Sequence, residues 1–418
     1  MKNLKLLVVA LVAMFGFSSC NKDCGHDFIE VDYSKTLIGT WTCQEANYAA
    51  AFVFNADGTA FTTGVENGEY WENVQVNWKV VNNKLTLSYG DNTSETLLEI
   101  ISGEFLSIAD KNGDRRKTYK YCANDLADEV VGMWVSNNGP TDMENEIQIR
   151  TYEKDGIVTT TGVRTIDGNP EWMLNEECNY RVVGDLIFKK RSKEIDGQLK
   201  VTHSAERFVY APKATALGDV MNVFFYLPMG DSYLKSTVAF LRINQSLNLA
   251  GKKYDYIKTF VTNVDGLDKD INFMGFEFNF AKMDGVKLDK MLKTLLFNVE
   301  FPDANTIKYS CHYNNEPMSM DAPIVVDGNK MTVKMSSKDA AYKDVDLYTF
   351  QDADCSQMHM YMPTYAFINF FGNMQATMMS QMGDLDLTDA AAVKAVFDSI
   401  DEAVNTINVS FVMEKAAK

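Results

Sequence analysis

The chain has 418 residues, which corresponds to about two to four domains. Hydrophobic residues make up 46% of it and aromatic residues 12%, so the chain can form packed cores and is not mainly disordered. The formal net charge of −17 argues against nucleic acids and anionic membrane surfaces as partners, because binding to phosphates needs clustered lysine and arginine. Such acidity is typical of a protein that must stay soluble after export.

Residues 1–19 have the composition of an export signal. Lys2 and Lys5 precede the apolar run Leu6–Phe17, whose twelve residues are too few to cross a bilayer as a helix. Two serines then precede Cys20. This arrangement resembles a bacterial lipobox, and the resemblance implies a lipoprotein signal peptide that is cleaved before Cys20, with lipid attached to that cysteine. Several acyl chains would anchor the protein stably to a membrane.

A polar tether over residues 20–36 leads into the first module, residues 37–124. From Leu37 onward, short apolar-alternating runs are separated by Asn, Asp and Gly, a pattern typical of antiparallel sheet. The module opens with Gly39-Thr40-Trp41 and contains the hairpin Trp78–Tyr89. Apolar residues alternate with polar ones along that hairpin, which predicts a sheet with one face in water.

A second module over residues 129–212 repeats these landmarks in the same order. Gly132-Met133-Trp134 matches the first opening, and Tyr152–Val163 matches Phe54–Val65 with the same Asp-Gly and Thr-Thr-Gly-Val spacing. The hairpin Tyr180–Lys190 matches Trp78–Tyr89, and we expect Phe208–Ala211 to take the place of the last strand, Lys120–Ala123. The repeated order predicts an internal duplication.

Residues 214–418 form a larger third module in this interpretation. It carries a third copy of the hairpin, Ile324–Met335, and ends on a predicted strand, Asn408–Met413. Three helices are predicted from apolar stripes: Val286–Phe297, Phe370–Met382, and a last helix that Thr388 can cap and whose stripe runs from Val393 to Ile407.

The Gly-x-Trp opening, the Phe-x-Phe strand with its Asp-Gly turn and the Trp-x-Val hairpin are similar to the lipocalin-like modules of Bacteroidetes lipoproteins. This resemblance implies a mainly β fold of three tandem antiparallel lipocalin-like β-barrels, the third with added α-helices. It also implies that Trp41 and Trp134 each close one end of a barrel beneath a basic residue. For Trp41 that residue would be Arg115, Arg116 or Lys120. The resemblance implies no particular activity.

Two cysteines of the first module form a candidate disulfide. Cys43 lies in its first predicted strand and Cys122 in its last, and those strands are neighbours in a closed barrel. Ser136 and Tyr210 stand at the matching places of the second module, so both cysteines are absent together. An exported protein can keep a disulfide, and the alternative is two free thiols.

Six methionines form the candidate ligand groove: Met358, Met360, Met362, Met374, Met378 and Met382. Strand alternation places the first three on one face, and helical spacing places the others on one stripe. They could line a groove for an apolar ligand, or simply fill the core. Thioethers also suit Cu(I), but His359 falls on the opposite strand face, so we predict no metal and no cofactor.

No catalytic residues are predicted, because the four histidines are scattered and no nucleophile motif accompanies them. Aromatic residues near predicted loops could stack on sugars: Tyr48, Tyr70, Trp71 and Trp172. We therefore expect a non-enzymatic protein, held at the outer membrane through lipid on Cys20, on its periplasmic face or at the cell surface. Its expected role is to bind a small apolar molecule or a glycan. The alternative is a structural or protein-interaction lipoprotein whose barrels are packed solid.

Overall fold

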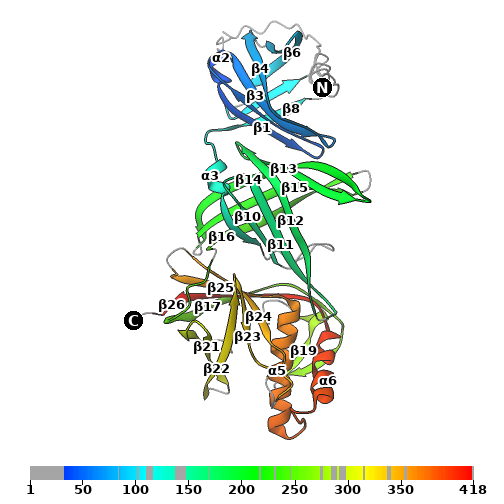
Figure 1. Cartoon of the computed structure of the whole chain (residues 1–418), viewed down its shortest axis with the longest axis vertical. Helices are drawn as coiled ribbons and strands as arrows, with labels where there is room; N and C mark the ends of the chain where they lie inside the picture. The colour runs from blue at the N-terminus through cyan, green and yellow to red at the C-terminus, as the bar shows by residue number, and fades with distance from the viewer. Residues whose placement is uncertain are drawn as a thin grey trace, which may run out of the picture.

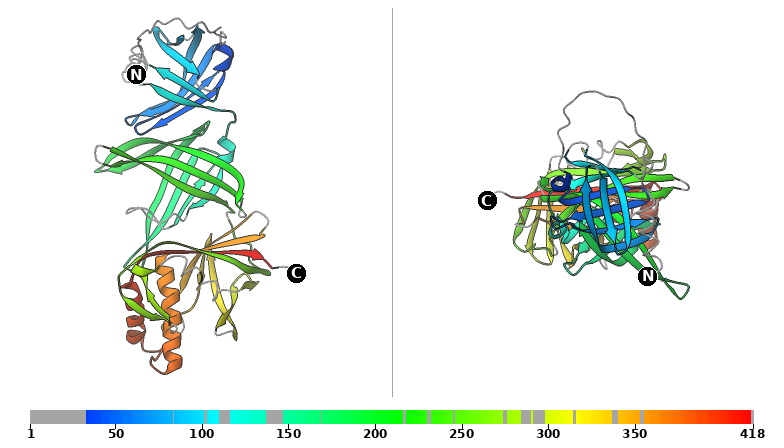
Figure 2. Two further views of the ribbon diagram at one scale, coloured as in Figure 1. Left: turned by 180° about the vertical axis from the view of Figure 1, so that it is seen from behind. Right: turned by 90° about the horizontal axis from the view of Figure 1, so that it is seen from above.

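The computed structural model describes residues 33–82, 84–100, 103–109, 116–136, 147–167, 169–215, 218–229, 232–244, 246–273, 276–283, 290, 298–313, 316–336, 340–352 and 355–416. It consists of three closed eight-stranded antiparallel barrels stacked along the long axis (Figure 1). Figure 2 shows the same stack from behind and from above. The predicted fold class is confirmed. In the described part of the chain, no helix is long and apolar enough to cross a membrane.

The first barrel follows the short helix α2 (Tyr33–Thr36) and closes by pairing its first strand with its last. Its strands are β1 (Gly39–Glu45), β2 (Tyr48–Phe54), β3 (Thr59–Glu66), β4 (Glu69–Val81), β5 (Lys84–Tyr89), β6 (Asn92–Ile100), β7 (Phe105–Ala109) and β8 (Lys117–Cys122). Large apolar side chains fill its interior, including Trp41, Phe52 and Phe54. The described side chains of this barrel therefore form a packed core.

The second barrel follows α3 (Ala127–Val130) and extends further along the chain than predicted. Its strands are β9 (Gly132–Ser136), β10 (Ile147–Tyr152), β11 (Ile157–Ile166), β12 (Asn169–Val183), β13 (Leu186–Ile195), β14 (Gln198–Thr215), β15 (Gly218–Met229) and β16 (Ser232–Ile243). The predicted boundary at residues 212–214 is wrong, because β15 and β16 are needed to close this barrel onto β9. Phe208–Ala211 accordingly lies in the sixth strand, not the last.

The third barrel contains β17 (Lys252–Gly266), β20 (Asn298–Asp303), β21 (Thr306–Tyr313), β22 (Glu316–Asp327), β23 (Lys330–Val333), β24 (Val345–Gln351), β25 (Gln357–Met362) and β26 (Val404–Lys415). A separate two-stranded sheet, β18 (Asp270–Phe273) with β19 (Phe276–Asn279), and the short 3-10 helix η1 (Phe280–Lys282) follow β17. The predicted helix Val286–Phe297 falls, except for residue 290, outside the described residues.

Two helices are inserted between the last two strands of the third barrel: α5 (Thr364–Met382) and α6 (Ala390–Asp401). Figure 1 shows them at the far end of the stack. The side chain of Asp389, not Thr388, caps α6 by accepting from the backbone N–H groups of Ala391 and Ala392. The predicted stripe also ran too far, because Ile407 belongs to β26.

The duplication of the first two barrels extends to their hydrogen bonds. The indole N–H of Trp41 donates to Leu37 O at 2.8 Å, and that of Trp134 donates to Val130 O at the same distance. The guanidinium of Arg242 lies 4.6 Å from the ring of Trp134, as the resemblance implied. Trp41 packs against Tyr121 at 5.1 Å, and Lys120 points from the outer face, while Arg115 lies outside the described residues.

All three copies of the hairpin are held in the same way. The backbone N–H groups of Trp78, Tyr180 and Ile324 each donate, at 2.7 Å, to a carbonyl in the turn between the two preceding strands. The acceptors are Gly58, Gly156 and Asn305. The hairpin is thus a repeated part of the scaffold in each barrel.

The barrels pack against one another through their outer faces. Between the first and second, Thr42 donates to Asp185 Oδ1 at 2.5 Å, and Arg207 donates to the carbonyl of Thr42 at 3.1 Å. Apolar side chains of both barrels, among them Val65 and Phe188, form a small core beside these bonds. Between the second and third, outward side chains of the second barrel join the largest core cluster: Val135, Ile147, Val163 and Ile243.

Candidate functional site

A cavity of about 540 Å³ lies between the end of the first barrel and the mouth of the second. Its roof consists of the connections between β1 and β2 and between β3 and β4. Its floor is the polar end of the second barrel's interior, with Ser136, Gln148, Arg150, Ser204 and Glu206. Phe225, Tyr226 and Tyr233 line it from the side. The cavity therefore depends on both barrels.

The roof is built from two turns that bind each other. Asn67 and Gly68 have φ angles of 49° and 85°, the left-handed values that a tight Asn-Gly hairpin requires. The backbone N–H of Asn67 donates to Asn47 O at 2.9 Å, and the Asn47 amide donates back to Asn67 Oδ1 at 2.8 Å. This pairing fixes the roof as one unit above the mouth.

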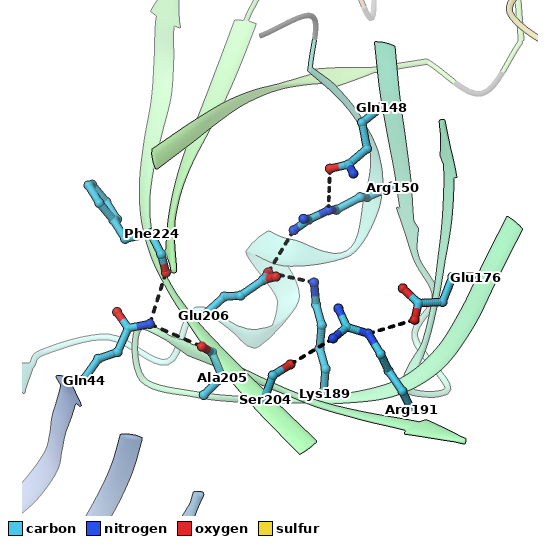
Figure 3. A network of polar contacts seen from close by, with 10 residues as sticks. All are labelled: Gln44, Gln148, Arg150, Glu176, Lys189, Arg191, Ser204, Ala205, Glu206 and Phe224. Atoms are coloured by element: carbon cyan, nitrogen blue, oxygen red, sulfur yellow. Dashed lines mark hydrogen bonds and ion pairs between the residues drawn. The ribbon is translucent and has the colours of Figure 1, made fainter. Parts of the chain in front are cut away.

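The opening below the roof arises where two hairpins separate. The pairing of β14 with β15 ends at Arg207 and Phe224, whereas each strand continues with its other neighbour. Gln44 of the first barrel closes this fork, because its amide donates to the carbonyls of Ala205 at 3.3 Å and Phe224 at 3.1 Å (Figure 3). The two barrels are thus joined at the edge of the cavity.

The centre of the floor is a buried charged network (Figure 3). Glu206 Oε2 accepts from Arg150 Nη1 at 2.8 Å and from Lys189 Nζ at 2.7 Å. Arg150 Nε donates to Gln148 Oε1 at 3.1 Å, and its guanidinium lies 4.6 Å from the ring of Phe240. The side chains of Lys189 and Glu206 are only 1% and 8% exposed. Two buried cations therefore share one carboxylate oxygen.

Strand alternation explains how these charges reach the interior. On β13, Ile187 belongs to the barrel core, so Lys189 and Arg191 point to the same side. Glu206 lies opposite Ile187 on β14, and Ser204 opposite Lys189. The inner face therefore changes from apolar to charged toward the mouth.

Arg191 forms a second, more exposed ion pair at the rim. Its Nε lies 2.9 Å from Glu176 Oε1, and its Nη1 donates to Ser204 Oγ at 3.5 Å. Both charged side chains are about one-third exposed, at 36% and 34%. This pair has no net charge, so it does not offset the positive charge that Arg150 and Lys189 carry beyond that of Glu206.

The environment shifts the pKa values of both buried partners. Burial, and then the charge of Arg150, lower the pKa of Lys189 to about 8. Burial alone would raise the pKa of Glu206, but Arg150 and Lys189 together lower it to about 2. At neutral pH the three groups therefore carry two positive charges and one negative charge.

His203 lines the cavity on the side of the first barrel. Its ring stacks on Tyr70 with centroids 4.5 Å apart. Burial and the charge of Lys190 lower its pKa, so it is mainly neutral at pH 7. His203 therefore adds a polar aromatic surface to the cavity and little charge.

The six methionines do not form the predicted ligand groove. Met358, Met360 and Met362 are buried in the core of the third barrel, while Met382 is 64% exposed on α5. Met374 only packs against that core from the side, and Met378 is half-buried. None of the six lines the cavity between the first two barrels. Their packing role follows from the flexible, apolar methionine side chain.

The predicted disulfide is wrong. Cys43 and Cys122 are both free thiols. Their strands β1 and β8 do pair, but Cys122 lies opposite Thr40, whereas Cys43 shares the inner face with Trp41. The two sulfur atoms therefore belong to opposite faces of the sheet, and a bond between them would require the sheet to deform. Cys20 lies outside the described residues.

The predicted sugar-stacking aromatics have different positions. Trp71 is buried in the first barrel, and its indole donates to Thr62 at 3.1 Å. Tyr48 lines the cavity but is mostly buried, and its hydroxyl shares a 2.6 Å hydrogen bond with Tyr119. Tyr70 reaches the site only through its stack on His203. The aromatic walls come mainly from β15 and β16, whose aromatic residues were not among the predicted site residues.

The charged residues were also overlooked, although the duplication contains a signal for them. By strand register, Arg150 occupies the place of Phe52, since each lies opposite the tryptophan that opens its barrel. Lys189 likewise takes the place of Leu87, since each lies opposite the first aromatic residue of the hairpin. The second barrel therefore has charged residues at two inward positions where the first barrel has apolar ones, which distinguishes its interior from that of the first.

The fold and site define a tandem β-barrel protein with a charged, ligand-sized cavity between its first two barrels. No protein-family model matches the chain, and no curated protein matches it. Among solved structures it is similar to a double mutant of transferrin binding protein B from Haemophilus parasuis, with 11% sequence identity and a TM-score of 0.23. It is also similar to transferrin binding protein B from Neisseria meningitidis, with 10% identity and a TM-score of 0.20. Each match covers 89% of this chain and 66% of the other chain. A Helicobacter pylori β clamp has 7% identity and a TM-score of 0.14, covering 93% of this chain and 94% of its own. Scores this low carry no argument about function.

Proposed function

We propose that this chain is a lipid-anchored protein of the cell envelope that binds a small glycan between its first two barrels without transforming it. The observation that carries the proposal is the cavity of about 540 Å³, which falls within the range of about 300–1,000 Å³ typical of small-molecule sites. One or two sugar rings are of a suitable size for it.

The polarity of the lining favours a glycan over an apolar molecule. Ser136, Gln148, Ser204 and Glu206 supply hydroxyl, amide and carboxylate groups that can exchange hydrogen bonds with sugar hydroxyls. The rings of Phe225, Tyr226 and Tyr233 supply apolar surface beside them. An apolar ligand would cover this polar lining without exchanging hydrogen bonds with it, which is costly.

Ligand titration against a blocked variant tests the proposal. Ser204→Trp places a large ring at the partly buried floor, and Ser319→Trp makes the same change at an exposed place on the third barrel. Calorimetry with mono- and disaccharides should show binding to the wild type and to Ser319→Trp, and none to Ser204→Trp. Binding that is unchanged in Ser204→Trp, or absent from the wild type, would contradict the proposal.

The membrane anchor is supported by the sequence of residues 1–20 and has its own test. Cys20→Ala should remove the lipid, which intact mass spectrometry of the protein from membranes would detect as a lost mass addition. The variant should also leave the membrane fraction. Retention of the lipid in Cys20→Ala would contradict the assignment of Cys20.

A structural or interaction role is the second candidate, and the filled interior of the first barrel favours it for that part of the chain. Trp41, Phe52, Phe54 and Leu85 are almost completely buried there. In this role the cavity would be only a gap at the junction of two barrels. Absence of glycan binding, with a stable co-purifying protein partner, would favour this candidate.

A further inference from the structure

We infer that the glycan held in this cavity carries a carboxylate, as a sugar acid does, which compensates the cation that Glu206 leaves unbalanced. The inference rests on the proposed function and specifies its ligand class.

The charge balance of the floor favours an anionic ligand. Arg150 and Lys189 both donate to the same oxygen of Glu206, so three buried groups have a net charge of +1. An uncompensated charge is expensive in a barrel interior, because little water is available to solvate it. A ligand carboxylate in the cavity would supply the missing negative charge.

Among the described residues, the other charged groups around the cavity are already paired. Glu45 lines the roof but accepts from Lys117, and Glu176 accepts from Arg191 at the rim. His203 is mainly neutral at pH 7, because its pKa is lowered. The excess positive charge is therefore not cancelled by the described groups that face the cavity.

Arg150 is the accessible cation of the network. It lines the cavity, whereas Lys189, which donates to Glu206, does not line it. The hydrogen bonds of Arg150 to Gln148 and Glu206 use two of its five N–H donors. A planar guanidinium suits a carboxylate, so Arg150 would contact the ligand and Lys189 would act as a positioning residue that supplies charge without touching it.

The duplication of the first two barrels supports a ligand independently of the charge balance. The first barrel has Phe52 and Leu87 where the second has Arg150 and Lys189. The apolar pair fits a packed interior, and the same scaffold closes around it without any charge. The charged pair is therefore not required by the barrel and points to a ligand.

Matched sugars provide the experiment. Galacturonate and galactose differ in that one carries a carboxylate, as do glucuronate and glucose, and each would be titrated calorimetrically into the full chain at pH 7 and low salt. We expect each sugar acid to bind about tenfold more tightly than its neutral partner, because charge-assisted hydrogen bonds are worth about 1.5–3 kcal/mol. The preference should shrink as salt is added.

Lysine variants then locate the preference. Lys189→Met should bring the acid and neutral sugar to within about twofold, while Lys190→Met, on the exposed face of the same strand, should keep the full preference. Equal affinities in the wild type would overturn the inference and leave the proposed function standing. Binding of neither sugar would overturn the proposed function itself. The wild-type comparison decides even if Lys189→Met fails to fold.

Discussion

Glu206→Gln is predicted to destabilise the second barrel strongly. The change preserves shape but removes the carboxylate that the hydrogen bonds of Arg150 and Lys189 share. Breaking a buried ion pair by removing one partner typically costs about 3–5 kcal/mol, because the remaining charge stays buried without compensation. Because two buried cations would remain here, we expect the free energy of unfolding to fall by an amount at the upper end of that range.

Lys189→Met should behave in the opposite way, although it breaks the same network. It leaves Arg150 paired with Glu206 at 2.8 Å and removes the excess cation. The fall in the pKa of Lys189 from 10.5 to about 8 corresponds to roughly 3 kcal/mol by which the fold disfavours the charged amine. Methionine is similar in length and apolar, so we expect this variant to be near neutral or more stable.

Urea unfolding followed by tryptophan fluorescence measures both changes. All five tryptophans lie in the first two barrels, so the signal reports on them: Trp41, Trp71, Trp78, Trp134 and Trp172. Glu176→Gln is the control, because its partly exposed ion pair should be worth less than about 1 kcal/mol. The reasoning is refuted if Lys189→Met lowers the free energy of unfolding as much as Glu206→Gln does. It is also refuted if Glu206→Gln lowers that free energy no more than the control.

Glu206, Gly372 and the thiols of Cys43 and Cys122 each provide a further test of the structure. The pKa of Glu206 falls from 4.5 in the unfolded chain to about 2 in the folded protein, so the stabilisation by its carboxylate is complete above pH 4.5 and is lost as pH falls toward 2. Urea unfolding measured across this pH window should show a free energy of unfolding that falls by about 3 kcal/mol with acid. Glu206→Gln should lack this fall. Gly372→Ala places a methyl group against the ring of Phe397, which forces α5 away from α6. The free energy of unfolding should fall by about 1–3 kcal/mol, and circular dichroism should show a lower Tm. Cys43 and Cys122 should both be alkylated in denaturant without reductant; a mass lacking these two additions would show that they are bonded.

Much of the fold could be predicted because its signals are local. Strand alternation and the turns between strands predicted the last strand, Asn408–Met413, which lies within β26. Barrel closure is not local: Leu241 pairs with Val135 more than a hundred residues earlier, and nothing in β15 or β16 themselves indicates which barrel they complete. The predicted end of the second module therefore came two strands too early. Phe208–Ala211 resembled the last strand of the first barrel only in its local alternation.

The site could not be found in the same way, because its members are far apart in sequence and meet only through strand register. Glu206 is 56 residues from Arg150, and neither belongs to a recognisable motif. The methionines attracted attention because they are conspicuous and apolar, but apolar side chains are those that a core buries. A better criterion was present in the repeat itself: a charged residue at a place where the other copy has a core residue. Phe52 and Leu87 show what the barrel needs in order to fold, so Arg150 and Lys189 show what its second copy has added.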